Sequence, residues 1–169
     1  SVVPRTALQQ VWSPPDFIQG RAGCIRLRMR KGYDFMLGTG YLPSCGCVGY
    51  WEQVIALWNW FDEVYHEQPL RTLPVIGLDA NARLGTRPLN TTAHLGLIGP
   101  HGHQQENQPG REFRSFLQRA GFTAISTLYA DAAGSTYYDS RGHSSRIDYI
   151  LSTPYAAEYI QAVRVERKI

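Results

Sequence analysis

Residues 77–81, GLDAN, place an acid and an amide two positions apart, directly after a short apolar run. An ionised Asp can coordinate a hard cation or accept a proton from water, and an Asn amide can donate a hydrogen bond to a phosphoryl oxygen. On an extended backbone Asp79 and Asn81 would point to the same side and could meet on one ligand. The alternative is that both residues simply cap a turn, and the spacing taken alone favours the turn.

A second acid, Asp148, lies within the otherwise apolar run RIDYIL at residues 146–151. Because burying a lone carboxylate costs free energy, we expect this group to have a partner. That partner is either an Arg of the adjacent strand or a catalytic His that the acid orients. Tyr41, in the step YLP at residues 41–43, is expected at the end of a strand. There it could present its phenol to a cleft or pack as an ordinary core tyrosine.

Three histidines, His94, His101 and His103, lie in a long polar segment at residues 80–109. They could form a metal site, but they lack helical His-x-x-x-His spacing and a following carboxylate. Loops of this length without secondary structure of their own are usually functional or disordered. The sequence does not indicate what these histidines do.

The apolar pattern predicts the strands that would position these groups. Residues 22–30 and 33–40 are expected to form an antiparallel hairpin around the turn Lys31-Gly32. Residues 73–79 are expected to form a central buried strand that brings Asp79 to its carboxyl end, where α/β proteins place catalytic groups. Further extended segments are expected at 122–128, 135–138, 146–151 and 159–165, whereas residues 1–21 are expected to be irregular or the remnant of an upstream element.

Two helices are expected from apolar residues that recur every three or four positions. The first covers residues 50–66, and the second covers 110–120 and ends at Gly121. We expect the aromatic face of the first helix to pack in the core rather than stack on bases. Its apolar positions are Trp51, Val54, Ile55, Trp58, Phe61 and Tyr65. The order of elements indicates an α/β fold in which helices pack on a mixed sheet.

Composition limits the class of protein. A chain of 169 residues with 43% hydrophobic content can bury one sizeable core, so we expect a single domain across residues 1–169. The net charge of +3 is compatible with a polyanionic partner but is far below that of a dedicated nucleic-acid-binding tail. The three cysteines lack zinc-finger spacing and are expected to be reduced thiols of an intracellular protein. No apolar run is long enough for a membrane span, so no membrane partner is expected.

Taken in chain order, these motifs resemble the endonuclease/exonuclease/phosphatase superfamily, the deoxyribonuclease I-like fold. Within it the chain looks most like the endonuclease domains of non-LTR retrotransposon proteins. The resemblance spans about residues 22–153 and includes the segments around the second helix. The motifs that carry it are YLP at 41–43, the helix at 51–65, GLDAN at 77–81, NQPGREF at 107–113, GF at 121–122 and SRIDYIL at 145–151.

The resemblance implies a fold, an activity and roles for four residues. The fold would be part of a four-layer α/β sandwich with mixed, mostly antiparallel sheets. The activity would be hydrolysis of DNA phosphodiester bonds with Mg²⁺ or Mn²⁺, in the nucleus if this is a mobile-element endonuclease. Asp79 would be the base or metal-facing acid, Asn81 would contact the scissile phosphate and join Asp79 at the metal, Tyr41 would contact that phosphate, and Asp148 would hold the imidazole of a catalytic His.

The sequence also departs from the family pattern. The family supplies an Asn and a metal-binding Glu before the hairpin, but no Glu precedes Glu52 and no Asn precedes Asn59. The family's closing Ser-Asp-His is missing after Asp148, and Leu78 separates Gly77 from Asp79. We therefore expect a domain truncated at both ends, with at most feeble catalysis. The alternatives are a phosphatase or lipid phosphodiesterase of the same fold, or a non-catalytic nucleic-acid-binding or interaction remnant of a mobile element.

Overall fold

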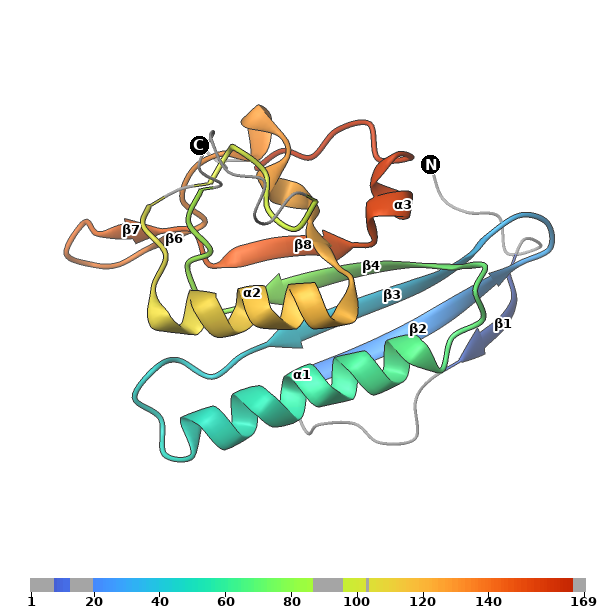
Figure 1. Ribbon diagram of the computed structural model, residues 1–169, viewed down its shortest axis with the longest axis horizontal. Coiled ribbons are helices and arrows are strands. Elements are labelled where there is room, and N and C mark those ends of the chain that lie inside the picture. Colours follow the sequence, from blue (N-terminus) through green and yellow to red (C-terminus); the bar gives the residue numbers. More distant parts are fainter. Residues whose placement is uncertain (1–7, 13–19, 87–95, 103, 166–169) are drawn as a thin grey trace.

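A six-stranded mixed sheet forms the centre of the protein (Figure 1). The computed structural model describes residues 8–12, 20–86, 96–102 and 104–165. The strands follow the spatial order β1-β2-β3-β4-β8-β5, with β3 and β4 parallel and the other neighbours antiparallel. Their bounds are β1 Leu8–Trp12, β2 Ala22–Met29, β3 Asp34–Tyr41, β4 Thr72–Asp79, β5 Thr123–Ala124 and β8 Asp148–Ser152. The expectation of an α/β fold with a mixed, mostly antiparallel sheet is confirmed.

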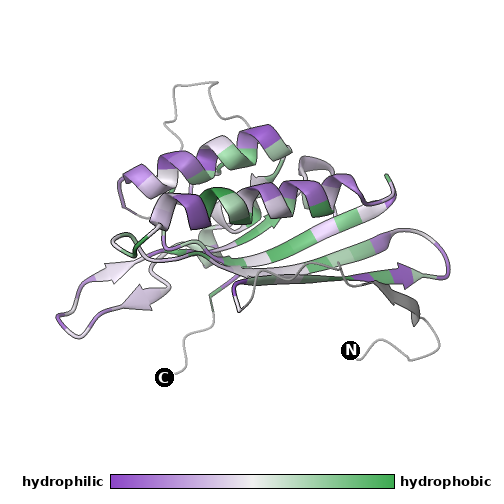
Figure 2. Ribbon diagram, turned by 90° about the horizontal axis from the view of Figure 1, so that it is seen from below, coloured by the Kyte–Doolittle hydropathy of each residue, from purple (hydrophilic) through white to green (hydrophobic). Residues whose placement is uncertain are grey.

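Two long helices pack side by side against one face of this sheet (Figure 2). They are α1, Tyr50–His66, and α2, Gln108–Ala120, which ends at Gly121 in the left-handed conformation as expected. The smaller elements are a 3₁₀ helix at Ile125–Thr127, another at Ala130–Ala132, the hairpin of β6 Tyr137–Tyr138 with β7 Ser144–Ser145, and α3 Pro154–Ala157. On the opposite face, Ala132 and residues 163–165 line a cavity together with Thr39 and Gly77 of the sheet.

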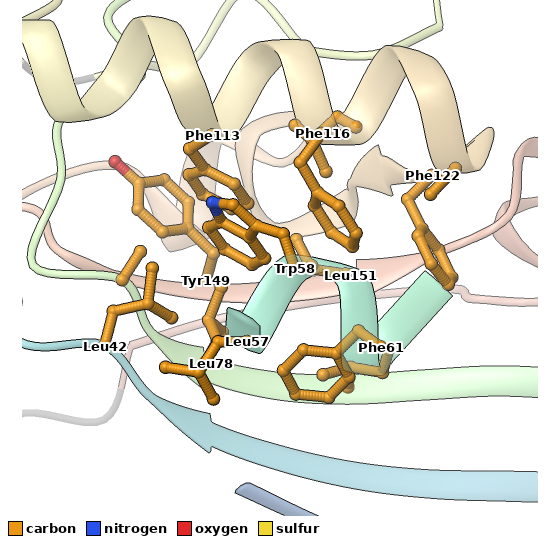
Figure 3. Close-up of a cluster of buried hydrophobic side chains, with 14 of the residues drawn as sticks. Leu42, Leu57, Trp58, Phe61, Leu78, Phe113, Phe116, Phe122, Tyr149 and Leu151 are labelled. Carbon is orange, nitrogen blue, oxygen red and sulfur yellow. The ribbon is translucent and has the colours of Figure 1, made fainter. Parts of the chain in front are cut away.

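An aromatic cluster fills the space between the helices and the sheet (Figure 3). The Trp58 ring stacks on Phe113 with centroids 5.1 Å apart and on Phe116 at 4.3 Å. The aromatic face of α1 is therefore core, as expected. One position was wrong, because Ile55 is 55% exposed and the buried face of α1 instead includes Leu57, Trp60 and Val64. The buried face of α1 is therefore wider than the face predicted from the three- and four-residue spacing of its large apolar side chains.

The parallel pairing of β3 with β4 requires a crossover, and α1 supplies it. Close packing at Gly40 seats this helix on the sheet, because a Cβ there would lie 2.8 Å from Leu78 and 2.9 Å from Phe61. As a result Tyr41 pairs with Asp79 in register at one edge of the sheet. Strand β8 runs antiparallel to β4 and sets Asp148 opposite Asp79.

At the opposite end of the β3–β4 pair lies a second acid, Asp34, whose charge is compensated by neighbouring groups. Asp34 is fully buried and accepts hydrogen bonds from the Met29 amide at 3.1 Å and from the Arg71 Nη2 at 3.1 Å and Nε at 3.2 Å. The Arg26 guanidinium adds an ion pair at 3.6 Å. This carboxylate joins β2, β3 and the segment before β4.

The ends of the chain differ from expectation. Residues 8–12 form β1, paired with β2, where an irregular segment was expected; the prolines that suggested it lie on either side of this strand. Residues 159–165 form no strand. Instead, the Tyr129 hydroxyl donates to the Ile160 carbonyl, and the Val165 amide donates to the backbone carbonyl of Asp131. Isolated bonds of this kind fix a segment without extending the sheet.

Several other element boundaries also differ by one or more residues, and two of them have a visible cause. The strand expected at 122–128 stops after Ala124, because the Thr127 hydroxyl donates to the Ala124 carbonyl and the chain turns into a 3₁₀ helix. Helix α2 starts at Gln108 rather than Gly110, because Asn107 caps it. In both places a short polar side chain decides where the element ends.

All three cysteines are free thiols, as expected, with Cys24 buried and Cys45 and Cys47 exposed. Among the helices in the described part of the chain, none has the length and apolar character needed to cross a membrane.

Candidate active site

The three strand-borne candidates Tyr41, Asp79 and Asp148 meet at one edge of the sheet. Tyr41 ends β3, Asp79 ends β4 and Asp148 begins β8, and their backbone positions are neighbours in register. Tyr41 is 46% exposed, and the Arg21 guanidinium lies over its ring, 5.1 Å from the ring centroid. The phenol is therefore presented to solvent rather than packed in the core.

A tight turn joins Asp79 to Asn81. The Asn81 amide donates to Asp79 Oδ1 at 3.1 Å, and Asn81 adopts a left-handed backbone with φ of 45°. Its side-chain Nδ2 donates to the Leu42 carbonyl at 2.7 Å. The turn that the spacing favours is therefore present in place of an extended backbone, and it still brings both side chains to the same cavity. Strained backbone of this kind is common at functional sites.

Asp148 does not have the environment expected for it. The side chain is exposed rather than buried, and it lines a cavity together with Arg146 and residues 163–165. Among the described residues no Arg forms an ion pair with it and no His hydrogen-bonds to it. Its position is fixed instead through the backbone, since the Thr136 hydroxyl accepts from the amides of Ile147 and Asp148 at 3.1 Å each.

Burial and charge together raise the pKa of Asp79. Burial is the larger cause, and the facing Asp148 carboxylate adds to it, whereas the hydrogen bond from the Asn81 amide acts in the opposite direction. A carboxylate in this environment binds positive charge more readily than an exposed one does. The site thus favours a proton or a cation at Asp79.

Two cavities flank this acid. A polar cavity of about 580 Å³ lies on the side of the turn, and its lining includes Tyr41, Ser44, Asp79, Asn81, Arg83, Asn107 and Tyr137. A second cavity of about 540 Å³ lies over the sheet face and includes Asp79, Asp148 and Arg146. Tyr41 and Asp79 line both cavities, so a ligand in either one would contact them.

Buried groups behind the edge hold the turn in place. The Tyr149 hydroxyl accepts from the Leu84 amide at 3.1 Å and lies 3.2 Å from the Ala82 carbonyl and 3.1 Å from the Arg146 carbonyl. Burial raises the pKa of Tyr149 to about 12. This tyrosine therefore stays neutral and anchors residues 82–84 to β8.

The Arg146 guanidinium is also buried. It donates to the Ser126 carbonyl at 2.7 Å and to the His101 carbonyl at 3.0 Å, and burial lowers its pKa. Arg146 thereby links β8 to two segments far away in the sequence. Its role in the described contacts is to hold backbone, not to pair with an acid.

The oxygen-rich donor set suits a hard divalent cation. Asp79 supplies a carboxylate, and the Asn81 amide is fixed through Nδ2, which leaves its oxygen available. These groups would supply part of a coordination shell. They do not complete it, since the described residues contain no cluster of three or more His, Cys, Asp or Glu side chains. His94 and His103 lie outside the described residues, so the histidine site stays a prediction. His101 is described and uses its backbone carbonyl to accept from Arg146.

Several residues that line the polar cavity were not predicted as site residues, and Arg83 and Asn107 are two of them. Asn107 could have been identified, because an Asn followed by Pro109 just before a periodic apolar run is a helix-start signal. Arg83 carries no such signal, because its place in the sequence is the same as that expected for an ordinary solvent-exposed Arg.

Comparison with known proteins supports the fold. No protein-family model matches the sequence, and no curated protein matches it. Among solved structures, the chain is similar to the 3′-5′ exonuclease NExo from Neisseria meningitidis, with 21% identity over 94% of this chain, 64% of that chain and a TM-score of 0.58. It is likewise similar to a 3′ phosphatase NExo from Neisseria bound to a product DNA hairpin, with 21% identity over 94% of this chain, 63% of that chain and a TM-score of 0.57.

The chain thus spans slightly less than two thirds of the length of these two structures. At this level of identity the likeness establishes the fold, which is the deoxyribonuclease I-like α/β fold expected from the motifs.

Proposed function

We propose that this chain carries part of the active site of a divalent-metal-dependent phosphodiesterase that hydrolyses DNA. The observation that carries the proposal is the convergence of Tyr41, Asp79 and Asn81 on one polar cavity at the carboxyl ends of β3 and β4. A phenol, a carboxylate and an amide around one cavity can position a phosphodiester and an attacking water. The DNA-bound and exonuclease relatives of the same fold support this substrate class.

Each residue has a distinct role in the proposal. Asp79 accepts a proton from the attacking water or faces the metal, since its environment favours positive charge. Asn81 uses one Nδ2 hydrogen on Leu42 and keeps the second for a phosphoryl oxygen. Tyr41 donates its exposed phenol to the same phosphate, and Asp148 would hold the imidazole of a catalytic His that the described residues do not supply.

Mg²⁺ or Mn²⁺ would be held by Asp79 and the Asn81 amide oxygen, with the family's metal-binding Glu absent from this chain. When bound, the cation would act as a Lewis acid that stabilises negative charge on the transferring phosphoryl group. An origin in a non-LTR retrotransposon and a nuclear location are part of the same proposal, and they rest on the motif resemblance alone.

The test is plasmid nicking in Mg²⁺ or Mn²⁺ by the chain and two variants. Asp79→Ala is expected to slow nicking by about 100-fold or more, since general-base or metal-facing groups contribute at least that much. Glu63→Ala removes the same charge from an exposed position on α1 and is expected to change nothing. Equal nicking by the Asp79→Ala variant would remove this acid from the mechanism. Nicking that survives EDTA would contradict the metal requirement.

A second candidate is a nucleic-acid-binding module without catalysis. The observation that favours it is the incomplete metal donor set among the described residues. DNA binding without any metal-dependent nicking would select this candidate over the phosphodiesterase.

A further inference from the structure

Arg83 supplies positive charge to the polar cavity. Of the described residues that line this cavity, it is the one with a cationic side chain, and it shares the lining with Asp79, Asn81 and Tyr41. Its charge also lowers the pKa of the nearby Tyr149. The lining of the cavity therefore contains both a carboxylate and a guanidinium.

No acid within the described residues neutralises Arg83. By contrast, Arg71 pairs with Asp34, Arg114 with Glu106 and Arg141 with Asp139. The Arg83 Nε is shielded from solvent and has no hydrogen-bond acceptor among the residues described. A shielded donor without an acceptor costs free energy, so a guanidinium left in this state calls for an explanation beyond packing.

The backbone of Arg83 is held firmly although its side chain is not. Its amide donates to Asn107 Oδ1 at 3.0 Å, and its carbonyl accepts from the Asn107 amide at 3.2 Å. Gly110 packs so closely that a Cβ there would lie 1.9 Å from the Arg83 carbonyl oxygen. Asn107 is also the N-cap of α2, so the positive end of that helix lies beside the same residue. Arg83 is thus pre-positioned at the wall of the cavity.

A phosphodiester that enters this cavity would meet the Asp79 carboxylate, which repels it. Arg83 offsets that repulsion, because a guanidinium offers planar, paired donors that match phosphate oxygens. We propose that Arg83 binds a backbone phosphate of the DNA strand in this cavity and positions it beside Asp79. The inference rests on the proposed function, and it adds a substrate contact that the motifs do not indicate.

The test measures binding of a short fluorescein-labelled DNA duplex by anisotropy, in EDTA, over a series of salt concentrations. Arg83→Ala and Arg83→Gln are each expected to weaken binding by about five-fold and to reduce the salt slope by about 1, the value for one lost phosphate contact. Arg83→Gln keeps most of the side-chain stem, so it reports on charge if the Ala variant folds poorly.

Two further variants serve as matched controls. Arg83→Lys keeps the charge and is expected to retain the salt slope. Arg119→Ala removes the same charge from an exposed site in the last turn of α2 and is expected to retain both slope and affinity. An unchanged slope in both charge-removing Arg83 variants, an equal loss in Arg119→Ala, or no binding by the unsubstituted chain would overturn the proposal.

The outcome is independent of catalysis because EDTA prevents metal-dependent hydrolysis. A reduced slope without any Asp79-dependent nicking would support the phosphate contact and reject the phosphodiesterase. Asp79-dependent nicking with an unchanged slope would do the reverse.

Discussion

Asp34 and Asp79 lie at opposite ends of the parallel pair β3–β4, in opposite electrostatic environments. Asp34 is fully buried and is satisfied by two arginines and one backbone amide. Asp79 receives one amide, faces another carboxylate, and forms no ion pair with any described cation. Each acid lies at a strand end, yet only one is compensated.

The difference separates stability from reactivity. Removing a buried carboxylate whose charge is compensated destabilises the fold, because its partners lose their acceptor, and such a carboxylate has no capacity left for a ligand. A carboxylate left uncompensated costs stability, and it keeps its affinity for a proton, a metal or a water. On this basis Asp34 is structural and Asp79 is the better candidate for chemistry.

The largest expected effect is at Asp34. Replacing it by Ala leaves the Met29 amide and two guanidinium groups without their acceptor, and we expect a loss of about 3 kcal/mol in the free energy of unfolding. The melting temperature should fall by about 10 °C. Thermal unfolding followed by circular dichroism measures it, with Asp79→Ala as the matched variant. Equal destabilisation by both variants would break the comparison.

A smaller effect is expected at Arg71, whose side chain is 46% exposed. Arg71→Ala removes two hydrogen bonds to Asp34 but leaves the Met29 amide and Arg26 in place, so we expect a loss of about 1 kcal/mol. Urea unfolding at low and high salt checks this, and the loss should shrink as salt screens the exposed pair. Arg119→Ala, with the same change in charge, should leave unfolding unchanged.

Asp79→Asn is expected to stabilise the protein slightly, by about 2 °C in melting temperature at neutral pH. The pKa of Asp79 is raised on folding, so the folded state binds the proton more tightly than the unfolded state does. Its contribution to stability therefore falls as pH rises from the unfolded pKa of about 3.9 to the higher folded value. Melting curves should show a higher melting temperature for Asp79→Asn at pH values above the folded pKa of Asp79. They should show no difference at pH values below the unfolded pKa. A gain that persists at the acid end would contradict the assignment.

The smallest expected effect is a change in the pKa of Asp79 when the facing carboxylate of Asp148 is removed. Asp148→Asn removes the like charge and should lower the pKa of Asp79, although not to its ordinary value, because burial is the larger cause. Carboxyl carbon chemical shifts followed through a pH titration measure the change. An unchanged titration of Asp79 would show that the two carboxylates do not interact.

The sequence was sufficient to predict the sheet edge that gathers Tyr41, Asp79 and Asp148. Apolar alternation located their strands, and strand-end positions in an α/β fold converge. Alternation could not predict that Asp148 is exposed. The strand pattern shows which residues share the face opposite the helices, but tertiary packing decides whether that face is covered. The same limit explains Ile55, which fits the helical period but faces solvent.

The spacing favoured a turn at Asp79 and Asn81, but the left-handed backbone of Asn81 and the position of Arg83 were not predicted, for a different reason. The left-handed backbone of Asn81 depends on the Leu42 carbonyl, which is 39 residues away in the chain. The position of Arg83 depends on Asn107, which is 24 residues away. Contacts of this kind leave no local periodicity, so they become visible only when the chain is folded.

The Tyr149 hydroxyl has a consequence for the dynamics of residues 82–84. Because it accepts the Leu84 amide from within the core, that proton can exchange with solvent only when β8 separates from the turn. Leu84 should therefore exchange on the slow timescale of the central strands, although it belongs to no helix or strand. In Tyr149→Phe the same amide should exchange far faster, while amides in the middle of β3 should keep their protection. The turn that carries Asn81 and Arg83 would then open and close with the core rather than as an independent loop.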